Sequence, residues 1–150
     1  MKYIENKIIL SWNDIDKLVS SICNKVLLRI GNRLEKYDII AISKGGVIPA
    51  TIISYRMGIK NIHLFPIVDK KVRKSRVPRF SHSKRYLLID EIYDTGNTID
   101  KVSRYLETIT HQDIFLLKRY AISSKVSDHI CGKILDDPRW VVFPWEQRKN

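Results

Sequence analysis

The chain has 150 residues, of which 44% are hydrophobic, and this is enough for one domain of ordinary size with a real core. Its formal net charge is +11, and residues 69–85 alone carry +7 of it. No apolar run could span a bilayer, and the charged start MKYIENKIIL argues against a signal peptide, so we expect a cytoplasmic protein without a membrane partner. The two cysteines and four histidines lack the spacing of a metal site.

Helices and strands alternate along the first half of the chain. Ser11 or Asn13 could cap the first helix, and Gly58 suits the end of the second. The expected elements are a helix with apolar positions from Ile15 to Leu34, a strand over residues 39–42, the loop SKGG, a helix over residues 47–57 and a strand over residues 62–68.

The basic segment, residues 69–85, reads DKKVRKSRVPRFSHSKR and has no apolar periodicity. It is long for a loop in so small a domain, which favours either a functional lid or disorder. Its eight Lys and Arg residues against one Asp would suit a small polyanionic ligand as well as a nucleic acid. Charge alone therefore does not identify its partner.

The second half continues the alternation with strands over residues 86–90 and 114–117. A helix opens between them at Asn97 or Thr98, and the tail is less regular until the stretch over residues 140–145. Continuously apolar strands alternating with helices predict an α/β fold with a mostly parallel central sheet and helices on both faces. Ligands of such sheets bind beyond the carboxyl ends of the strands, where the loops SKGG, DEIYDTGNT and KRY would gather.

The stretch YLLIDEIYDTGNTI carries the most specific chemistry. A phosphate monoester fits the turn from Asp94 to Thr98, because Gly96 permits a positive φ and the threonines add hydroxyl donors. Asp90 and Glu91 could bind sugar hydroxyls, directly or through a divalent cation. An alternative interpretation is a strand that ends in solvated acids before a turn that caps a helix. The acidic strand of a P-loop nucleoside triphosphatase is a further alternative, but the G-x-x-x-x-G-K-[ST] loop that it requires is missing.

The loop SKGG offers a second compact anion site. Lys44 supplies a positive charge, and Gly45 and Gly46 would let backbone amides face a ligand. A Gly-Gly turn between a strand and a helix is ordinary by itself. Two anion sites together with a cationic segment imply a substrate that has anionic groups at two ends.

These residues resemble a known family. LLIDEIYDTGNTI is similar to the phosphoribosyl-pyrophosphate signature of the type I phosphoribosyltransferases, and AISKGGVIPA resembles their pyrophosphate loop. WVVFPWE and LSWNDIDKLV resemble the short enzymes of this family that act on xanthine, guanine or hypoxanthine. The resemblance covers nearly the whole chain, and it implies a single phosphoribosyltransferase domain over residues 1–150 with a mobile basic lid at about 69–85.

The resemblance also implies roles for individual residues. Asp94 matches the acid that takes a proton from the purine, although the same position suits a purely structural cap of the phosphate loop. Lys44 would act with it in catalysis, in a loop that carries a cis or otherwise strained peptide bond. The 5′-phosphate and ribose would bind Asp90, Glu91, Asp94, Thr95, Gly96, Asn97 and Thr98, with Asp90 and Glu91 also meeting Mg²⁺. Pyrophosphate would bind Ser43, Lys44 and Gly45, and the base would bind Lys118, Trp140 and Val141.

The implied activity is purine salvage. Phosphoribosyl pyrophosphate and a 6-oxopurine would give the nucleoside monophosphate and pyrophosphate, and the enzyme would form a dimer or tetramer. Three departures from the family pattern stand out: Glu91 in place of Asp, Lys44 in place of Arg, and a more basic lid. The third leaves open an alternative, a non-catalytic regulator that senses nucleotides or binds nucleic acid on the same fold.

Overall fold

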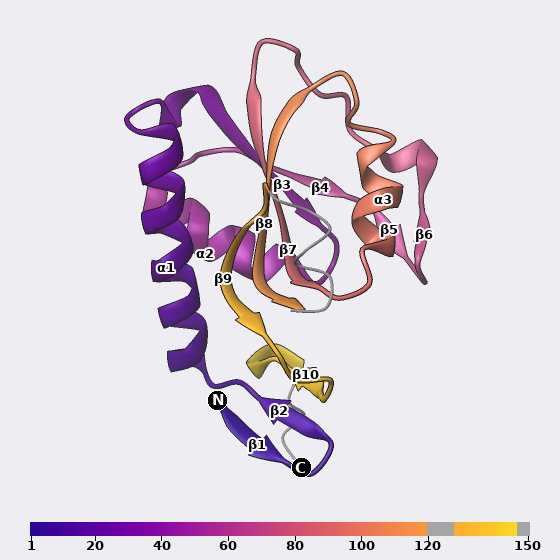
Figure 1. Ribbon diagram of the computed structural model, residues 1–150. Coiled ribbons are helices and arrows are strands. Elements are labelled where there is room, and N and C mark those ends of the chain that lie inside the picture. Colours follow the sequence, from indigo (N-terminus) through magenta and orange to yellow (C-terminus); the bar gives the residue numbers. More distant parts are fainter. Residues whose placement is uncertain (120–127, 147–150) are drawn as a thin grey trace.

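The computed structural model describes residues 1–119 and 128–146. At its centre is a five-stranded sheet in the order β4-β3-β7-β8-β9, in which all neighbouring strands are parallel (Figure 1). The predicted parallel sheet is thus confirmed. Its strands are β3 (Tyr37–Ile42), β4 (Ile62–Phe65), β7 (Arg85–Tyr93), β8 (Thr110–Arg119) and β9 (Ile130–Leu135).

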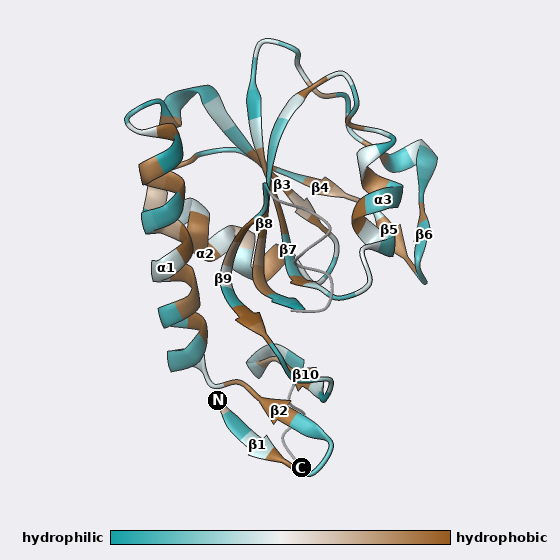
Figure 2. Cartoon of the chain, in the orientation of Figure 1, coloured by the Kyte–Doolittle hydropathy of each residue, from teal (hydrophilic) through white to brown (hydrophobic). Residues whose placement is uncertain are grey.

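Three helices cover the two faces of this sheet: α1 (Trp12–Ile30), α2 (Val47–Met57) and α3 (Asn97–Ser103). Alternate side chains of a strand point to opposite faces. In β3, accordingly, Ile39 and Ala41 pack in the core beneath α1 and α2, whereas Ile40 and Ile42 pack in the core beneath α3. Figure 2 shows the strands of the central sheet hydrophobic along much of their length, as burial on both faces requires.

The helix ends follow the predicted chemistry. Ser11 caps α1, because its hydroxyl accepts from the backbone N–H of Asp14 at 3.2 Å and the Asp14 carboxylate accepts from the Ser11 N–H at 2.8 Å. The helix ends at Gly31, so Leu34 lies beyond it in the short helix η1 (Leu34–Lys36). The second helix has the predicted bounds, and Gly58 ends it with a left-handed φ of 67°.

Several strand predictions need correction. Pro66 divides the expected strand over residues 62–68, because proline has no N–H to donate to a ladder. The third predicted strand does not end at Asp90, since β7 continues to Tyr93 and pairs there with β8. The fourth begins earlier, at Thr110. β9 and the N-terminal strands β1 (Lys2–Ile4) and β2 (Lys7–Ile9) were not predicted.

The basic segment is more regular than its sequence indicates. β5 (Ile67–Val68) pairs with β6 (Lys71–Val72) in an antiparallel hairpin. Asp69 and Lys70 form its two-residue turn with φ of 49° and 61°, the left-handed geometry that tight hairpins favour. The short helix η2 (Lys74–Arg76) follows. Whether this segment closes as a lid stays a prediction.

A second, smaller sheet has the order β1-β2-β10 and lies at the lower end of the view in Figure 1. β10 (Trp140–Val142) runs parallel to β2, with Val141 opposite Ile8. This pairing fixes the tail against the N-terminal hairpin. The short helix η3 (Pro144–Glu146) follows β10.

The strand order locates the crevice where a ligand would bind. The chain leaves β3 through α2 to β4 on one side, whereas it leaves β7 through α3 to β8 on the other. The topological switch point therefore lies between β3 and β7, and the loops that follow these strands border it. Among the described residues, no helix is both long and apolar enough to cross a membrane.

Candidate active site

A cavity of about 410 Å³ opens at the carboxyl end of β7, a size typical of small-molecule sites. Asp90, Glu91, Trp140 and the loop from Asp94 to Thr98 all line it. Gly96 has a φ of 88°, and a Cβ there would lie 2.8 Å from the hydroxyl oxygen of the Tyr93 beneath it. Backbone conformation and space both require glycine in this loop.

The two acids lie within β7 and not after it. Asp90 and Glu91 are consecutive in the strand, so their side chains start toward opposite faces. Burial and, to a smaller extent, the charge of Glu91 raise the pKa of Asp90 to about 7, although a hydrogen bond from the Glu91 N–H at 2.8 Å acts to lower it. Burial raises the pKa of Glu91 to about 7 as well, with a further contribution from Glu146. A bound cation would favour the ionised forms of both carboxyl groups.

This burial predicts how Asp90 affects stability. In the unfolded chain its pKa is near 3.8 and in the fold about 7, so ionisation weakens the fold progressively between these pH values. We expect Asp90→Asn to raise the free energy of unfolding by about 1 kcal/mol or more at pH 8 and to change it little at pH 4. Urea unfolding at the two pH values measures this, with Asp100→Asn as the exposed control. Equal effects of Asp90→Asn at both pH values would contradict the assignment.

Trp145 supports Glu91. Its ring stacks on Phe143 with centroids 4.9 Å apart and planes 13° apart. Its indole N–H also donates to Glu91 Oε2 at 3.3 Å, a contact that nothing in the sequence indicated. The tail therefore helps to hold one of the two acids of the cavity.

The loop after β3 lies against the same acids. The Ser43–Lys44 peptide bond is cis, as the resemblance implied. A Cβ on Gly45 would lie 2.6 Å from the Glu91 carboxyl carbon, so the loop passes close over that side chain, which would have to shift to admit a larger residue. Lys44 is exposed. The amide of Gly46, however, donates to the Ile42 carbonyl at 2.8 Å, so it does not face a ligand as expected.

Arg119 joins the loop after β7 to the tail. Its Nε donates to Asp94 Oδ1 at 3.1 Å, and its terminal nitrogens donate to the backbone carbonyls of Asp137 and, at 3.0 Å, Arg139. Asp94 and Arg119 line a smaller cavity of about 60 Å³ together with Trp140 and Val141. The Asp94 carboxylate and the Arg119 guanidinium therefore lie next to each other in the wall of this smaller cavity.

Lys118, the lysine expected to contact the base, does not line either cavity. It is only 4% exposed, and its Nζ lies 5.4 Å from the centre of the Tyr93 ring. The side chains of Lys118 and Arg119 start toward opposite faces of β8, and of these two adjacent cations Arg119 is the one that lines the smaller cavity. A role of Lys118 in binding the base stays a prediction.

Trp140 and Val141 lie where a planar base could bind. The Trp140 side chain is 65% exposed and borders both cavities, whereas Val141 is buried beside the smaller one. An indole so exposed contributes little to the core. It offers a flat apolar surface beside Asp94 and Arg119.

The acids also suit a magnesium ion that arrives with a phosphorylated ligand. Across residues 1–119 and 128–146, no three His, Cys, Asp or Glu side chains form a group that could hold a metal. Mg²⁺ commonly needs only one or two protein carboxylates, because water and substrate phosphates complete its shell. Asp90 and Glu91 fit that arrangement.

Comparison with known proteins finds similar proteins over most of the chain. A xanthine-guanine phosphoribosyltransferase from Idiomarina loihiensis is 24% identical over 146 residues, which cover 91% of this chain and 84% of that protein. A purine phosphoribosyltransferase structure from Pyrococcus horikoshii matches with a TM-score of 0.74 at 23% identity, covering 97% and 98% of the two chains. The chain has the type I phosphoribosyltransferase fold. The resemblance drawn from the phosphoribosyltransferase signature is confirmed.

A further structural neighbour contains a bound nucleotide. It is a hypothetical protein from Neisseria gonorrhoeae with bound ppGpp, with a TM-score of 0.70 at 20% identity, covering 97% and 92% of the two chains. No family model matches this phosphoribosyltransferase-like chain.

Proposed function

We propose that the protein transfers ribose 5-phosphate from phosphoribosyl pyrophosphate to guanine, hypoxanthine or xanthine, releasing pyrophosphate and the nucleoside monophosphate. The observation that carries this proposal is the Asp94–Arg119 pair, 3.1 Å apart beside the exposed face of Trp140. The named relatives that act on xanthine and guanine support the same substrate class. We place the activity in the cytoplasm.

The pair complements one edge of a 6-oxopurine. On that edge the ring nitrogen N7 and the oxygen on C6 are neighbours. A base protonated on N7 would donate to the Asp94 carboxylate, and its oxygen would accept from Arg119. Adenine presents an amino group at the same place, and a guanidinium has no acceptor for it. Arg119 therefore takes the role first expected of Lys118.

The remaining residues account for the sugar and its two anionic ends. The loop from Asp94 to Thr98 would hold the 5′-phosphate, and Asp90 and Glu91 would accept hydrogen bonds from the ribose hydroxyls. Ser43, Lys44 and Gly45 lie across the switch point and would bind pyrophosphate. Asp90 and Glu91 would also hold Mg²⁺, which when bound supplies positive charge that offsets the charge on pyrophosphate.

In the proposed reaction, a ring nitrogen of the base attacks the anomeric carbon as the bond from that carbon to pyrophosphate breaks, with inversion. The base loses its N7 proton to Asp94. Lys44 would stabilise the negative charge of the departing pyrophosphate. Trp140 would stack on the base and the Val141 backbone would contact its far edge. Closure of the basic segment would exclude water, which would otherwise hydrolyse the activated sugar.

The role of Arg119 predicts a change in base selection. We expect Arg119→Met to lower kcat/KM for guanine by about 100-fold or more, because the oxygen on C6 loses its donor. The value of kcat/KM for adenine should fall much less. The measurement is therefore the ratio of kcat/KM for guanine to that for adenine. Arg119→Lys should restore part of the guanine rate, and Lys118→Met should leave the ratio unchanged. A ratio that follows Lys118 instead would contradict the assignment.

A second candidate function is a nucleotide sensor without catalysis. The relative with bound ppGpp favours it, as does the basic segment, which would then contact nucleic acid. Binding of ppGpp or a salt-sensitive gel shift without any pyrophosphate release would support the sensor.

We also expect a homo-oligomer. Tyr55 on α2 is 86% exposed, and aromatic side chains of this kind are enriched at subunit contacts. Light scattering of the intact chain measures the assembly.

A further inference from the structure

Two lysines from different elements border the end of the cavity formed by the loop from Thr95 to Thr98. Lys70 comes from the turn of the β5–β6 hairpin, and Lys101 comes from α3, one turn beyond Thr98. They are 31 positions apart in the sequence, and the Lys101 Nζ donates to the Lys70 backbone carbonyl at 2.7 Å. This contact joins the hairpin turn to the helix that follows the loop.

The charges around the cavity indicate why a bound phosphate would need these lysines. Asp90, Glu91 and Asp94 line it, whereas Lys70 and Lys101 are the cationic residues of the same lining. The loop itself provides only hydroxyls and backbone amides, and α3 has just seven residues. A phosphate carries close to two negative charges at neutral pH, so binding it beside three carboxylates calls for cations nearby.

We propose that Lys70 and Lys101 bind the 5′-phosphate of the phosphoribosyl group as a pair of cations, with the Thr95–Thr98 loop as the third wall. This inference rests on the proposed function and deepens it, because it assigns part of the basic segment to the phosphate end of the substrate. An ammonium group has three donors, and Lys101 uses one of them for the Lys70 carbonyl. Lys101 lines the cavity, so its other two donors would serve a phosphate bound there.

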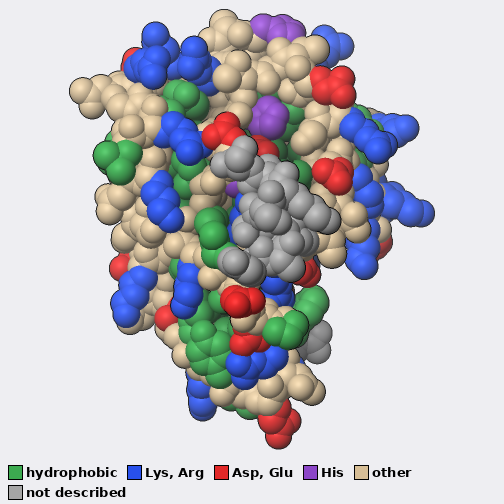
Figure 3. Space-filling model, viewed as in Figure 1, with side chains coloured by type: hydrophobic (Ala, Val, Ile, Leu, Met, Phe, Trp, Pro, Cys, Tyr) green, Lys and Arg blue, Asp and Glu red, His purple; other side chains and the backbone are tan. Residues whose placement is uncertain are grey.

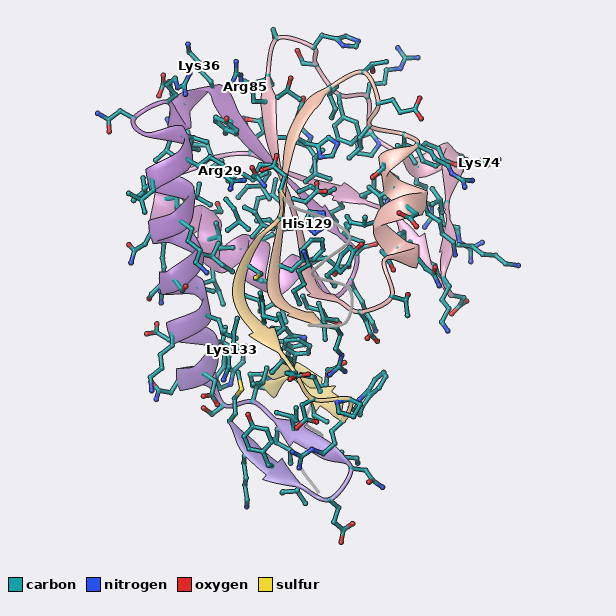
Figure 4. The ribbon with its side chains drawn as sticks, in the orientation of Figure 1. Arg29, Lys36, Lys74, Arg85, His129 and Lys133 are labelled. Atoms are coloured by element: carbon teal, nitrogen blue, oxygen red, sulfur yellow. The ribbon has the colours of Figure 1, made fainter. Side chains whose placement is uncertain are left out.

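Most of the basic segment lies elsewhere. Figure 3 shows Lys and Arg side chains gathered on the side of the molecule where α3 and β6 lie. Lys74, in η2, points outward at the edge of the molecule (Figure 4) and does not line the cavity. Lys74 is therefore a matched control, with the same charge and the same segment but without access to the phosphate.

The test is calorimetric titration of the intact protein with ribose 5-phosphate, which needs no assumption about the base. We expect Lys70→Met and Lys101→Met each to weaken binding about tenfold, and the double variant about 100-fold, because each removes a charge-assisted hydrogen bond. Lys101→Arg should retain most of the affinity. Lys74→Met should bind like the unaltered protein, and thermal unfolding checks that all variants fold.

Lys70→Met removes the charge of the Lys70 side chain but keeps the backbone carbonyl that Lys101 contacts. It therefore tests the charge without breaking the contact between the hairpin turn and α3. Affinity unchanged in Lys70→Met and in Lys101→Met would overturn the inference, even if the protein releases pyrophosphate as proposed. Conversely, lysine-dependent binding of ribose 5-phosphate by a protein that releases no pyrophosphate would uphold the phosphate site and reject the transferase. A loss in Lys74→Met equal to that in Lys70→Met would also overturn the inference, since it would reflect general charge.

Discussion

Replacing Asp94 with Asn is expected to lower kcat of the proposed transfer by 10²- to 10⁴-fold, the range typical of a lost general base. An amide cannot take the proton that leaves the purine ring. Its oxygen can still accept from Arg119 Nε, as Asp94 does at 3.1 Å, so the loop should keep its shape. Single-turnover measurement of nucleotide formation isolates this chemical step.

A binding measurement distinguishes the two roles suggested for Asp94. If it is a base, Asp94→Asn should still bind GMP with affinity near that of the unaltered protein. Asp100→Asn, an exposed acid in α3 outside the cavity, should change neither rate nor affinity. Should Asp94→Asn keep its rate within a few-fold while GMP binding weakens, the residue is a cap of the phosphate loop and not a base.

Gly96→Ala should have the second large effect. The alanine must adopt a φ near 88° with its Cβ about 2.8 Å from the hydroxyl oxygen of Tyr93, which lies beneath the loop. We expect GMP affinity to fall at least tenfold and the free energy of unfolding to fall by about 1 kcal/mol or more. Calorimetry and urea unfolding provide the two values.

Gly58→Ala is the matched control for this substitution. Gly58 also has a left-handed φ, of 67°, but a Cβ there meets nothing within 4 Å and lies far along the chain from the cavity loop, at the end of α2. It should cost similar backbone strain while leaving GMP affinity intact. Equal losses of affinity in both variants would mean that stability alone explains the effect at Gly96.

Much of the fold is predictable because its elements are local. The capping pair of Ser11 and Asp14 and the glycine after Met57 mark helix ends with residues that are adjacent in sequence. The buried strand β3 is recognisable from its apolar run over residues 39–42. The sequence did not predict β1, β2 and β9, because these strands are short or only partly buried. Pairing with strands that are distant in the sequence stabilises β2 and β9.

The candidate site was predictable where its residues are contiguous in the sequence. The residues from Asp90 to Thr98 are contiguous, and the structure gathers them on one cavity. Which of Lys118 and Arg119 lines a cavity was not predictable, because this depends on the face of β8 that each side chain takes. The contact of Trp145 with Glu91 and that of Lys101 with Lys70 join distant segments, so no local pattern indicates them.

The most direct test of the central claim is pyrophosphate release by the unaltered protein, measured with Mg²⁺, phosphoribosyl pyrophosphate and one nucleobase at a time. We predict base-dependent release with at least one of guanine, hypoxanthine and xanthine, and far slower release with adenine, uracil or orotate. Release with none of the three 6-oxopurines, by protein that still binds ribose 5-phosphate, would contradict the claim.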